Sequence, residues 1–229
     1  MKRVFAFGCS FTHYAWPSYA DYLGYEFDSF SNWAHPGLGN RAIAQRVAEC
    51  NIKNNFTKDD IILVQWSSHM RNDWHSFQAL KFDPNSFLHS WFKNTDIIGW
   101  KTQGSIFSIG NNLIYDDVWI DRFWDERSFF MYTMNDIAAT QGLLNSTGCT
   151  WRMTSIGELD KCGTDFPYHP DYGESHKPGR LSMWEREPAL KCYQTVFDNY
   201  KENWMSPIGL YTWDNPDDAY WFQGPDDKE

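Results

Sequence analysis

The fold is decided by a stretch near the amino terminus, Val4-Phe5-Ala6-Phe7-Gly8-Cys9-Ser10-Phe11-Thr12. Its four consecutive apolar residues predict a buried strand, and the Gly, Ser and Thr that follow predict a turn toward a helix. A serine at this point lies at the carboxyl edge of the sheet, where open α/β folds bind their ligands. Ser10 is therefore the first candidate functional residue.

The residues beyond this stretch alternate between helical and strand patterns, which is typical of β-α-β units around a parallel sheet. Residues 16–23 predict a helix with Pro17 in its first turn. Residues 30–33 predict a second strand, and the helical spacing over 42–48 predicts a second helix that Asn40 caps. These elements belong to one α/β domain.

The run Ile61-Ile62-Leu63-Val64 is apolar at every position, which predicts a central strand covered on both faces. The remaining elements are expected in this order: a helix over 129–144 that Gly142 interrupts or ends, a strand over 148–154, a long helix over 184–204 and a last strand over 208–213. We expect the aromatic-rich residues 76–125 to form an insertion over the strand ends and residues 157–182 to form a loop. The chain length predicts a single domain over residues 1–229.

Composition narrows the classes of partner. Thirty acidic and twenty basic residues give a net charge of −10, whereas a nucleic acid or an anionic membrane requires a basic patch. We therefore expect neither partner, and a neutral or weakly charged substrate instead.

The apolar run Val4–Phe7 is too short for a signal peptide, and the five scattered cysteines favour a reducing, cytoplasmic setting. No histidines or cysteines have the spacing of metal ligands, so we expect no metal and no cofactor.

Two segments resemble a known family. Gly8-Cys9-Ser10-Phe11 resembles the first block of the SGNH (GDSL-like) hydrolases, which usually reads Gly-Asp-Ser, and residues 32–40 resemble their second block, a glycine-rich loop. Gly37 best matches the glycine whose N–H binds the oxyanion, and Gly39 is the nearby alternative. A glycine suits this role because no side chain keeps its N–H from a substrate oxygen.

The resemblance implies a fold and a set of roles. The fold is a three-layer α/β/α domain with a flavodoxin-like parallel sheet. In such a domain Ser10 is the nucleophile, and the N–H groups of Ser10 and Gly37, together with Asn40, bind the oxyanion. The chain is also similar to SGNH-like proteins of marine bacteriophages; if it is phage-encoded, the expected cytoplasm is that of the host cell.

The third block departs from the family pattern. It normally ends the third strand with Gly-x-Asn-Asp, and the Asn is an oxyanion donor. Here the strand runs into residues 65–71 without that Asn. Ser67, Ser68 or His69 can donate instead, or Gln65 if it points toward the site; the alternative is an ordinary polar strand end with no such role.

The fourth block, Asp-x-x-His, supplies the base in the family, and it has no full match here. The nearest pair is Asp165 and His169, which stand one residue further apart than in the family pattern. His176 is a second candidate for the base. His13 and His35 lie close to the expected site in the chain and are the remaining alternatives.

Taken with the resemblance, these residues predict a serine esterase that works through an acyl-Ser10 intermediate, with His169 as the base and Asp165 orienting it. The expected substrate is a small ester, including an acyl group on a carbohydrate. The alternative is a non-catalytic SGNH-like protein that lacks the base and serves in binding or phage assembly. The thirteen tryptophans suit a binding surface of that kind.

Overall fold

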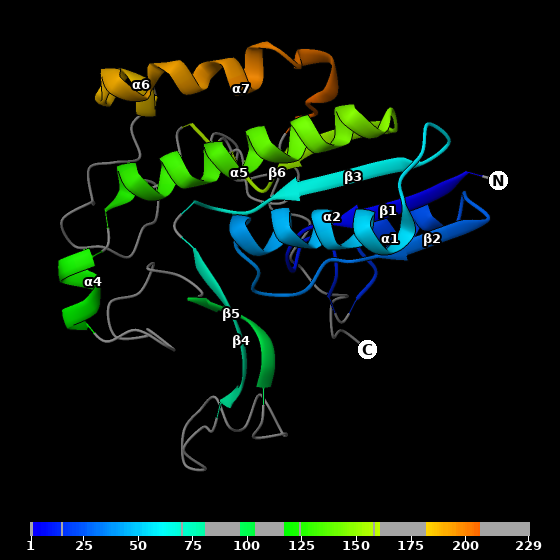
Figure 1. Ribbon diagram of the computed structural model, residues 1–229, viewed down its shortest axis with the longest axis horizontal. Helices are drawn as coiled ribbons and strands as arrows, with labels where there is room; N and C mark the ends of the chain where they lie inside the picture. Colours follow the sequence, from blue (N-terminus) through cyan, green and yellow to red (C-terminus); the bar gives the residue numbers. More distant parts are fainter. Residues whose placement is uncertain are drawn as a thin grey trace, which may run out of the picture.

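Four parallel strands form the central sheet, in the order β2-β1-β3-β6 (Figure 1). They are β1 (Arg3–Phe7), β2 (Ser29–Asn32), β3 (Ile61–Trp66) and β6 (Thr150–Ser155). This order is flavodoxin-like, and the order in which successive strands are added to the sheet reverses between β1 and β3. The predicted α/β class and parallel sheet are confirmed.

The computed structural model describes residues 2–14, 16–69, 71–80, 97–103, 117–123, 125–157, 159–160 and 182–206. The strand predicted over 208–213 lies outside these residues, as does most of the loop predicted over 157–182. Trp204 nevertheless forms a parallel bridge with Met153 of β6, and Met205 N donates to Met153 O at 2.8 Å. The chain therefore reaches a fifth strand position beside β6.

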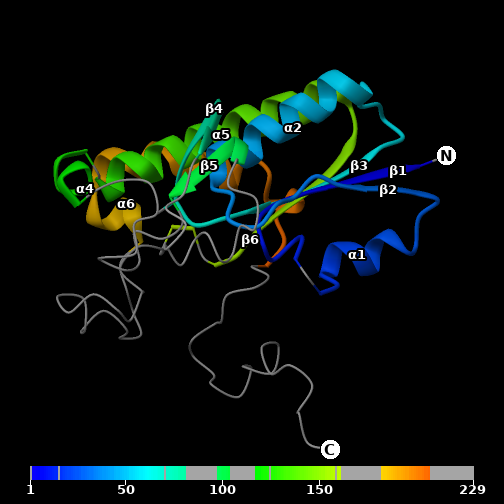
Figure 2. The ribbon, with the colours of Figure 1, turned by 90° about the horizontal axis from the view of Figure 1, so that it is seen from below.

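Helices cover both faces of the sheet, as Figure 2 shows. On one face α2 (Asn40–Asn54) and α5 (Glu126–Thr147) pack against each other, and α1 (Tyr19–Gly24) lies on the opposite face. The main core lies under α2 and α5, and it contains buried side chains from the sheet and from both helices: Phe5, Phe7, Ile43, Val47, Ile62, Val64, Trp66, Phe130, Met134 and Ile137. Each such side chain contributes about 1.5–3 kcal/mol on burial.

Two predicted helix starts are wrong in detail. Helix α1 begins after Ser18, which forms a capping box with Asp21, so Pro17 precedes the cap instead of lying in the first turn. Helix α2 is capped at Gly39, and Asn40 is its first residue. Asn40 does not cap the helix, because a carboxylate from a distant part of the chain, Asp73, accepts the N–H groups at this end.

Helix α5 does not end at Gly142, contrary to the prediction. It continues to Thr147 and stops at Gly148, which adopts a φ of 70°. One glycine in a helix costs only about 1 kcal/mol. The eight buried residues on the inner face of α5 outweigh that cost.

The long helix predicted over 184–204 is broken into short pieces. These are α6 (Met183–Arg186), the 3-10 helix η2 (Pro188–Gln194), α7 (Thr195–Asp198) and the 3-10 helix η3 (Lys201–Asn203). Pro188 lacks a backbone N–H and forces Glu187 into an extended conformation, with φ −136° and ψ 92°. The helix therefore cannot continue through this point.

The expected insertion contains regular structure that the sequence pattern did not indicate. An antiparallel hairpin of β4 (Asn72–Leu80) and β5 (Ile97–Gln103) projects from the parallel sheet (Figure 1), and α4 (Asp117–Phe123) follows. The hairpin begins four residues earlier than the expected boundary at residue 76 and packs against α2. Among the described helices, none combines the length and the apolarity that crossing a bilayer requires.

Candidate functional site

Ser10 lies in a tight turn at the carboxyl end of β1. The backbone N–H groups of Thr12 and His13 both donate to Cys9 O, at 3.0 and 3.1 Å. Ser10 itself is half-buried. A side chain at Gly8 would place its Cβ 2.0 Å from Thr12 Oγ1, so the turn closes only over a glycine.

Thr12 fixes this turn to its neighbours. Its hydroxyl donates to Gln65 Oε1 of β3 at 2.6 Å, in a buried position. Its carbonyl accepts from Ser18 Oγ at 2.6 Å and from Asn32 Nδ2 at 2.9 Å. The Ser10 turn is therefore bonded to β2, to β3 and to the cap of α1, and Gln65 serves as an anchor for Thr12.

The glycine-rich loop runs beside the Ser10 turn. The parallel bonding of β1 and β2 continues past the strands, since Trp33 N donates to Ala6 O at 2.8 Å and His35 N to Gly8 O at 3.2 Å. Gly37 follows, with a φ of 86° that disfavours other residues. The structure thus brings Ser10 and the Gly37 loop together at the carboxyl edge of the sheet.

The backbone N–H groups in this region differ in their partners. The Gly39 N–H donates to Asp73 Oδ1 at 2.9 Å, so it is already engaged. Within the described part of the chain, the N–H groups of Ser10 and Gly37 have no acceptor. Gly37, and not Gly39, therefore keeps a donor available for a ligand oxygen.

Asn40, the third expected oxyanion donor, is only 2 % exposed and joins three elements. Its Nδ2 donates to Ser67 O at 3.0 Å and to Thr133 Oγ1 at 3.2 Å, and its Oδ1 accepts from Ser67 N at 2.7 Å. Both amide hydrogens are engaged, so an oxyanion would have to displace one of these bonds. Asn40 ties α2 to the end of β3 and to α5.

The end of β3 carries a buried histidine that the sequence analysis considered only as a donor. His69 is fully buried, and its Nε2 lies 3.6 Å from Glu126 Oε1 at the start of α5. Phe130 contacts the imidazole edge-on, with ring centroids 5.6 Å apart. Among the residues that the structure describes, neither ring nitrogen has a hydrogen-bond partner. No local pattern indicates the pairing of His69 with Glu126, because the two residues lie far apart in the chain.

The expected base and its orienting carboxylate, His169 and Asp165, lie outside the described residues, and so does His176. The other two candidates are on the surface. His35 is exposed, and its Nδ1 lies 2.8 Å from Pro36 O. His13 is also exposed, in the turn that holds Ser10.

Two aromatic rings lie on the segment that follows Ser10. Tyr14 and Trp16 are in contact, with ring centroids 4.2 Å apart. Trp16 is 59 % exposed, an unusual exposure for a side chain of this size. Beneath this segment, burial raises the pKa of Tyr19 to about 12, so its hydroxyl stays neutral at physiological pH.

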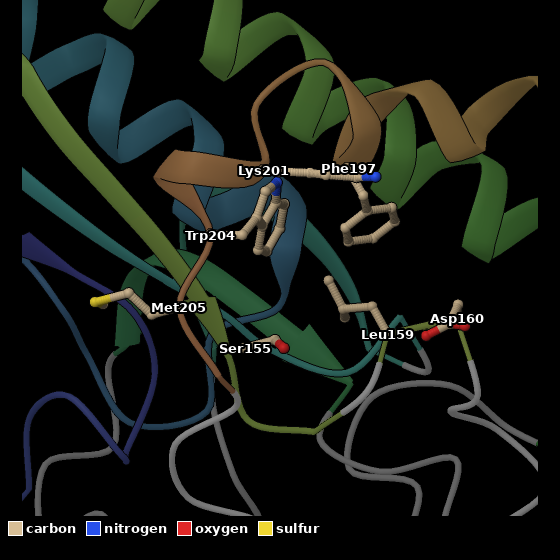
Figure 3. Close-up of a pocket in the computed structure, with 7 residues that line it drawn as sticks. All are labelled: Ser155, Leu159, Asp160, Phe197, Lys201, Trp204 and Met205. Carbon is tan, nitrogen blue, oxygen red and sulfur yellow. The ribbon is translucent and has the colours of Figure 1, made fainter.

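A cavity of about 230 Å³ opens at the carboxyl end of β6. Figure 3 shows Phe197 and Lys201 on one side of it and Ser155 and Leu159 on the other. The ring of Trp204, at the entry to the fifth strand position, completes the apolar lining. Because β6 is parallel to β1, this cavity lies at the same edge of the sheet as Ser10, beyond β3.

Among the described residues, no group of three or more His, Cys, Asp or Glu side chains is arranged to hold a metal ion. A comparison with models of known protein families finds no family that matches the chain. A comparison with curated proteins likewise finds no match. The fold and the geometry around Ser10 therefore carry the functional argument.

Proposed function

We propose that this protein is a serine esterase of the SGNH type, with Ser10 as its nucleophile. The observation that carries the proposal is the pair of N–H groups, from Ser10 and Gly37, that have no acceptor within the described residues and belong to adjacent segments at the carboxyl edge of the sheet. Donors arranged in advance around a developing oxyanion make the largest contribution in many acyl-transfer enzymes. The flavodoxin-like strand order supports a ligand at the same edge.

The proposed reaction has two steps. The Ser10 Oγ attacks the ester carbonyl carbon while its proton passes to His169, which Asp165 orients; the bond to the alcohol oxygen then breaks, and that oxygen takes the proton. In the second step a water molecule attacks the acyl carbon while one of its protons passes to His169; the bond from that carbon to Ser10 Oγ then breaks, Oγ takes the proton and the acid is released. The oxyanion of both tetrahedral intermediates is held by the N–H groups of Ser10 and Gly37, and Asn40 supports the loop or donates after rearrangement.

The substrate we propose is a small neutral ester, including an acyl group on a carbohydrate. The exposed Trp16 ring, on the segment after Ser10, offers an apolar face on which a sugar ring can stack. The net charge of −10 favours a neutral substrate over an anionic one.

The second candidate function is non-catalytic: an SGNH-like protein that binds a partner or serves in phage assembly. Two observations favour it. The strand end at Ser67 lacks the family's Asn donor, and the amide hydrogens of Asn40 are both engaged in the fold. A domain that retains the fold but has lost these donors and the base would bind without turnover.

Hydrolysis of p-nitrophenyl acetate separates the two functions. The esterase predicts hydrolysis that Ser10→Ala abolishes and Ser146→Ala leaves unchanged. Ser146 is a matched control because it is an exposed serine near the carboxyl end of α5, at the opposite edge of the sheet. His169→Asn should reduce the rate as strongly as Ser10→Ala, because the two residues act as a unit. Equal rates of hydrolysis for the wild type and Ser10→Ala would reject the esterase and leave the non-catalytic binding function.

A further inference from the structure

The start of α2 is capped by a residue from the insertion. Asp73 Oδ1 accepts the Gly39 N–H at 2.9 Å, and Asp73 Oδ2 accepts the Ala42 N–H at 3.0 Å. A helix is usually capped by the side chain of its N-cap residue, which directly precedes the first helical residue. Gly39 has no side chain, and the carboxylate comes instead from β4, more than thirty residues along the chain.

A second residue of the same segment holds the same loop. The Arg71 guanidinium donates through Nη1 to Leu38 O at 2.9 Å, so Arg71 and Asp73 bond the two successive residues Leu38 and Gly39. The packing is close, since a Cβ at Gly39 would lie 2.5 Å from Asp73 Oδ2 and 2.9 Å from Arg71 Cβ. Asp73 is only 8 % exposed, which shields its carboxylate from water.

The position of these contacts links the hairpin to the proposed oxyanion site. Gly37, with a φ of 86°, lies directly before the two residues that are held. Because glycine has no Cβ, steric hindrance alone does not keep its backbone in one conformation, and the loop needs other support. Hydrogen bonds from N–H groups to a carboxylate are short and strong, and a negative charge at the start of a 15-residue helix is further stabilised by the helix dipole.

We propose that Asp73 is a positioning residue, which holds the Gly37 N–H in its orientation toward the oxyanion by fixing Gly39 and the first turn of α2. The proposal rests on the proposed esterase function for its effect on activity. Its structural part, the dependence of the loop on the Asp73 carboxylate, is independent of that function. The insertion is then part of the active-site framework.

The first test is the rate at which a phosphonate probe labels Ser10 in the intact protein. Asp73→Asn and Asp73→Ala should slow labelling by about tenfold or more, in line with the loss of an oxyanion donor. Sodium formate, compared with sodium chloride at equal ionic strength, should restore part of the rate in Asp73→Ala, because a small anion can replace the carboxylate at the helix start. Formate should not change the wild-type rate.

Asp125→Ala is the matched control. Asp125 caps α5 by accepting the Ser128 N–H and does not belong to the segment that holds the Gly37 loop. This variant should lose stability and keep the wild-type labelling rate at temperatures where both proteins are folded. Folded Asp73→Ala that labels as fast as the wild type would overturn the proposal.

Hydrogen exchange keeps this proposal separate from the esterase function. Removal of the Asp73 side chain should increase exchange of the Gly39 and Ala42 amides, and formate should slow it again, whether or not Ser10 reacts. If the wild type is not labelled but these amides respond, the esterase function fails and the support of the loop by Asp73 stands. If exchange at both amides is unchanged in Asp73→Ala, the support itself is disproved.

Discussion

Single residues close the Ser10 turn, and their roles follow from space and from hydrogen bonds. Gly8 is required because Thr12 Oγ1 occupies the position of its missing side chain. Thr12 in turn depends on Gln65, the acceptor of its hydroxyl. This set is local to the ends of β1 and β3, so a change in any of its members is expected to act on the Ser10 turn first.

Gly8→Ala is predicted to lower the free energy of unfolding by about 2 kcal/mol, since the new Cβ forces Thr12 away from Gln65. Gly142→Ala provides the comparison. Gly142 lies within α5, and a Cβ built there has no neighbouring atom within 4 Å. This variant should therefore raise the free energy of unfolding by about 0.5–1 kcal/mol. Urea denaturation measures both, and a Gly8→Ala variant as stable as the wild type would contradict the close packing of the turn.

His69→Leu is predicted to keep or raise the free energy of unfolding, by up to about 1 kcal/mol. The imidazole is buried, and neither of its nitrogens has a hydrogen-bond partner within the described ranges of the chain, so a side chain of similar size without polar atoms removes the cost of burying unpaired nitrogens. Gln65→Leu should instead lower the free energy of unfolding by about 1–3 kcal/mol, because it leaves the Thr12 hydroxyl without its acceptor. A large loss in His69→Leu would mean that the contact with Glu126 stabilises the fold.

At the scale of the elements, the sequence predicts those whose signal is local. The apolar runs of β1 and β3 are strands, and the family-like glycine loop lies beside Ser10. The cap of α2 was not predictable because its carboxylate, Asp73, is remote in the chain. The hairpin has no local signal because its mixed polar and aromatic residues show no period of two, and Pro188 breaks a segment whose apolar spacing is otherwise helical.

At the amino edge of the sheet, an ion pair joins β1 to the residue that precedes β3. Arg3 of β1 donates to both carboxylate oxygens of Asp60, each at 2.7 Å, just before β3 begins. This bonding holds the pKa of the Asp60 carboxyl below its usual range. Because the folded-state pKa is lower than the unfolded one, the stabilisation is present above about pH 4 and is lost as the pH falls through the folded-state value.

Asp60→Asn should therefore lower the free energy of unfolding by about 2 kcal/mol at neutral pH, and by progressively less as the pH falls below about 4. The exposed neighbour Asp59 gives a control, and Asp59→Asn should be close to neutral at every pH. Denaturation curves at a series of pH values test this. A deficit in Asp60→Asn that does not change with pH would show that the charge of Asp60 is not the cause.

At the scale of the whole molecule, the carboxyl edge of the sheet concentrates the features that bear on function. Ser10, the Gly37 loop and His69 follow three adjacent strands, and the cavity at Ser155 follows the fourth. The hairpin of the insertion supports this edge through Asp73. Short motifs in the sequence single out Ser10 and Gly37 as candidates, whereas the contacts of Asn40, Asp73 and His69 depend on the folded chain.

We propose that Ser10 and the N–H groups of Ser10 and Gly37, which have no acceptor among the described residues, form an acyl-transfer site. Mass spectrometry after treatment with a serine-directed phosphonate tests it most directly. We expect one adduct, located on the peptide that carries Ser10, absent in Ser10→Ala and retained in Ser146→Ala. No adduct on folded wild-type protein, or an adduct that persists in Ser10→Ala, would contradict it.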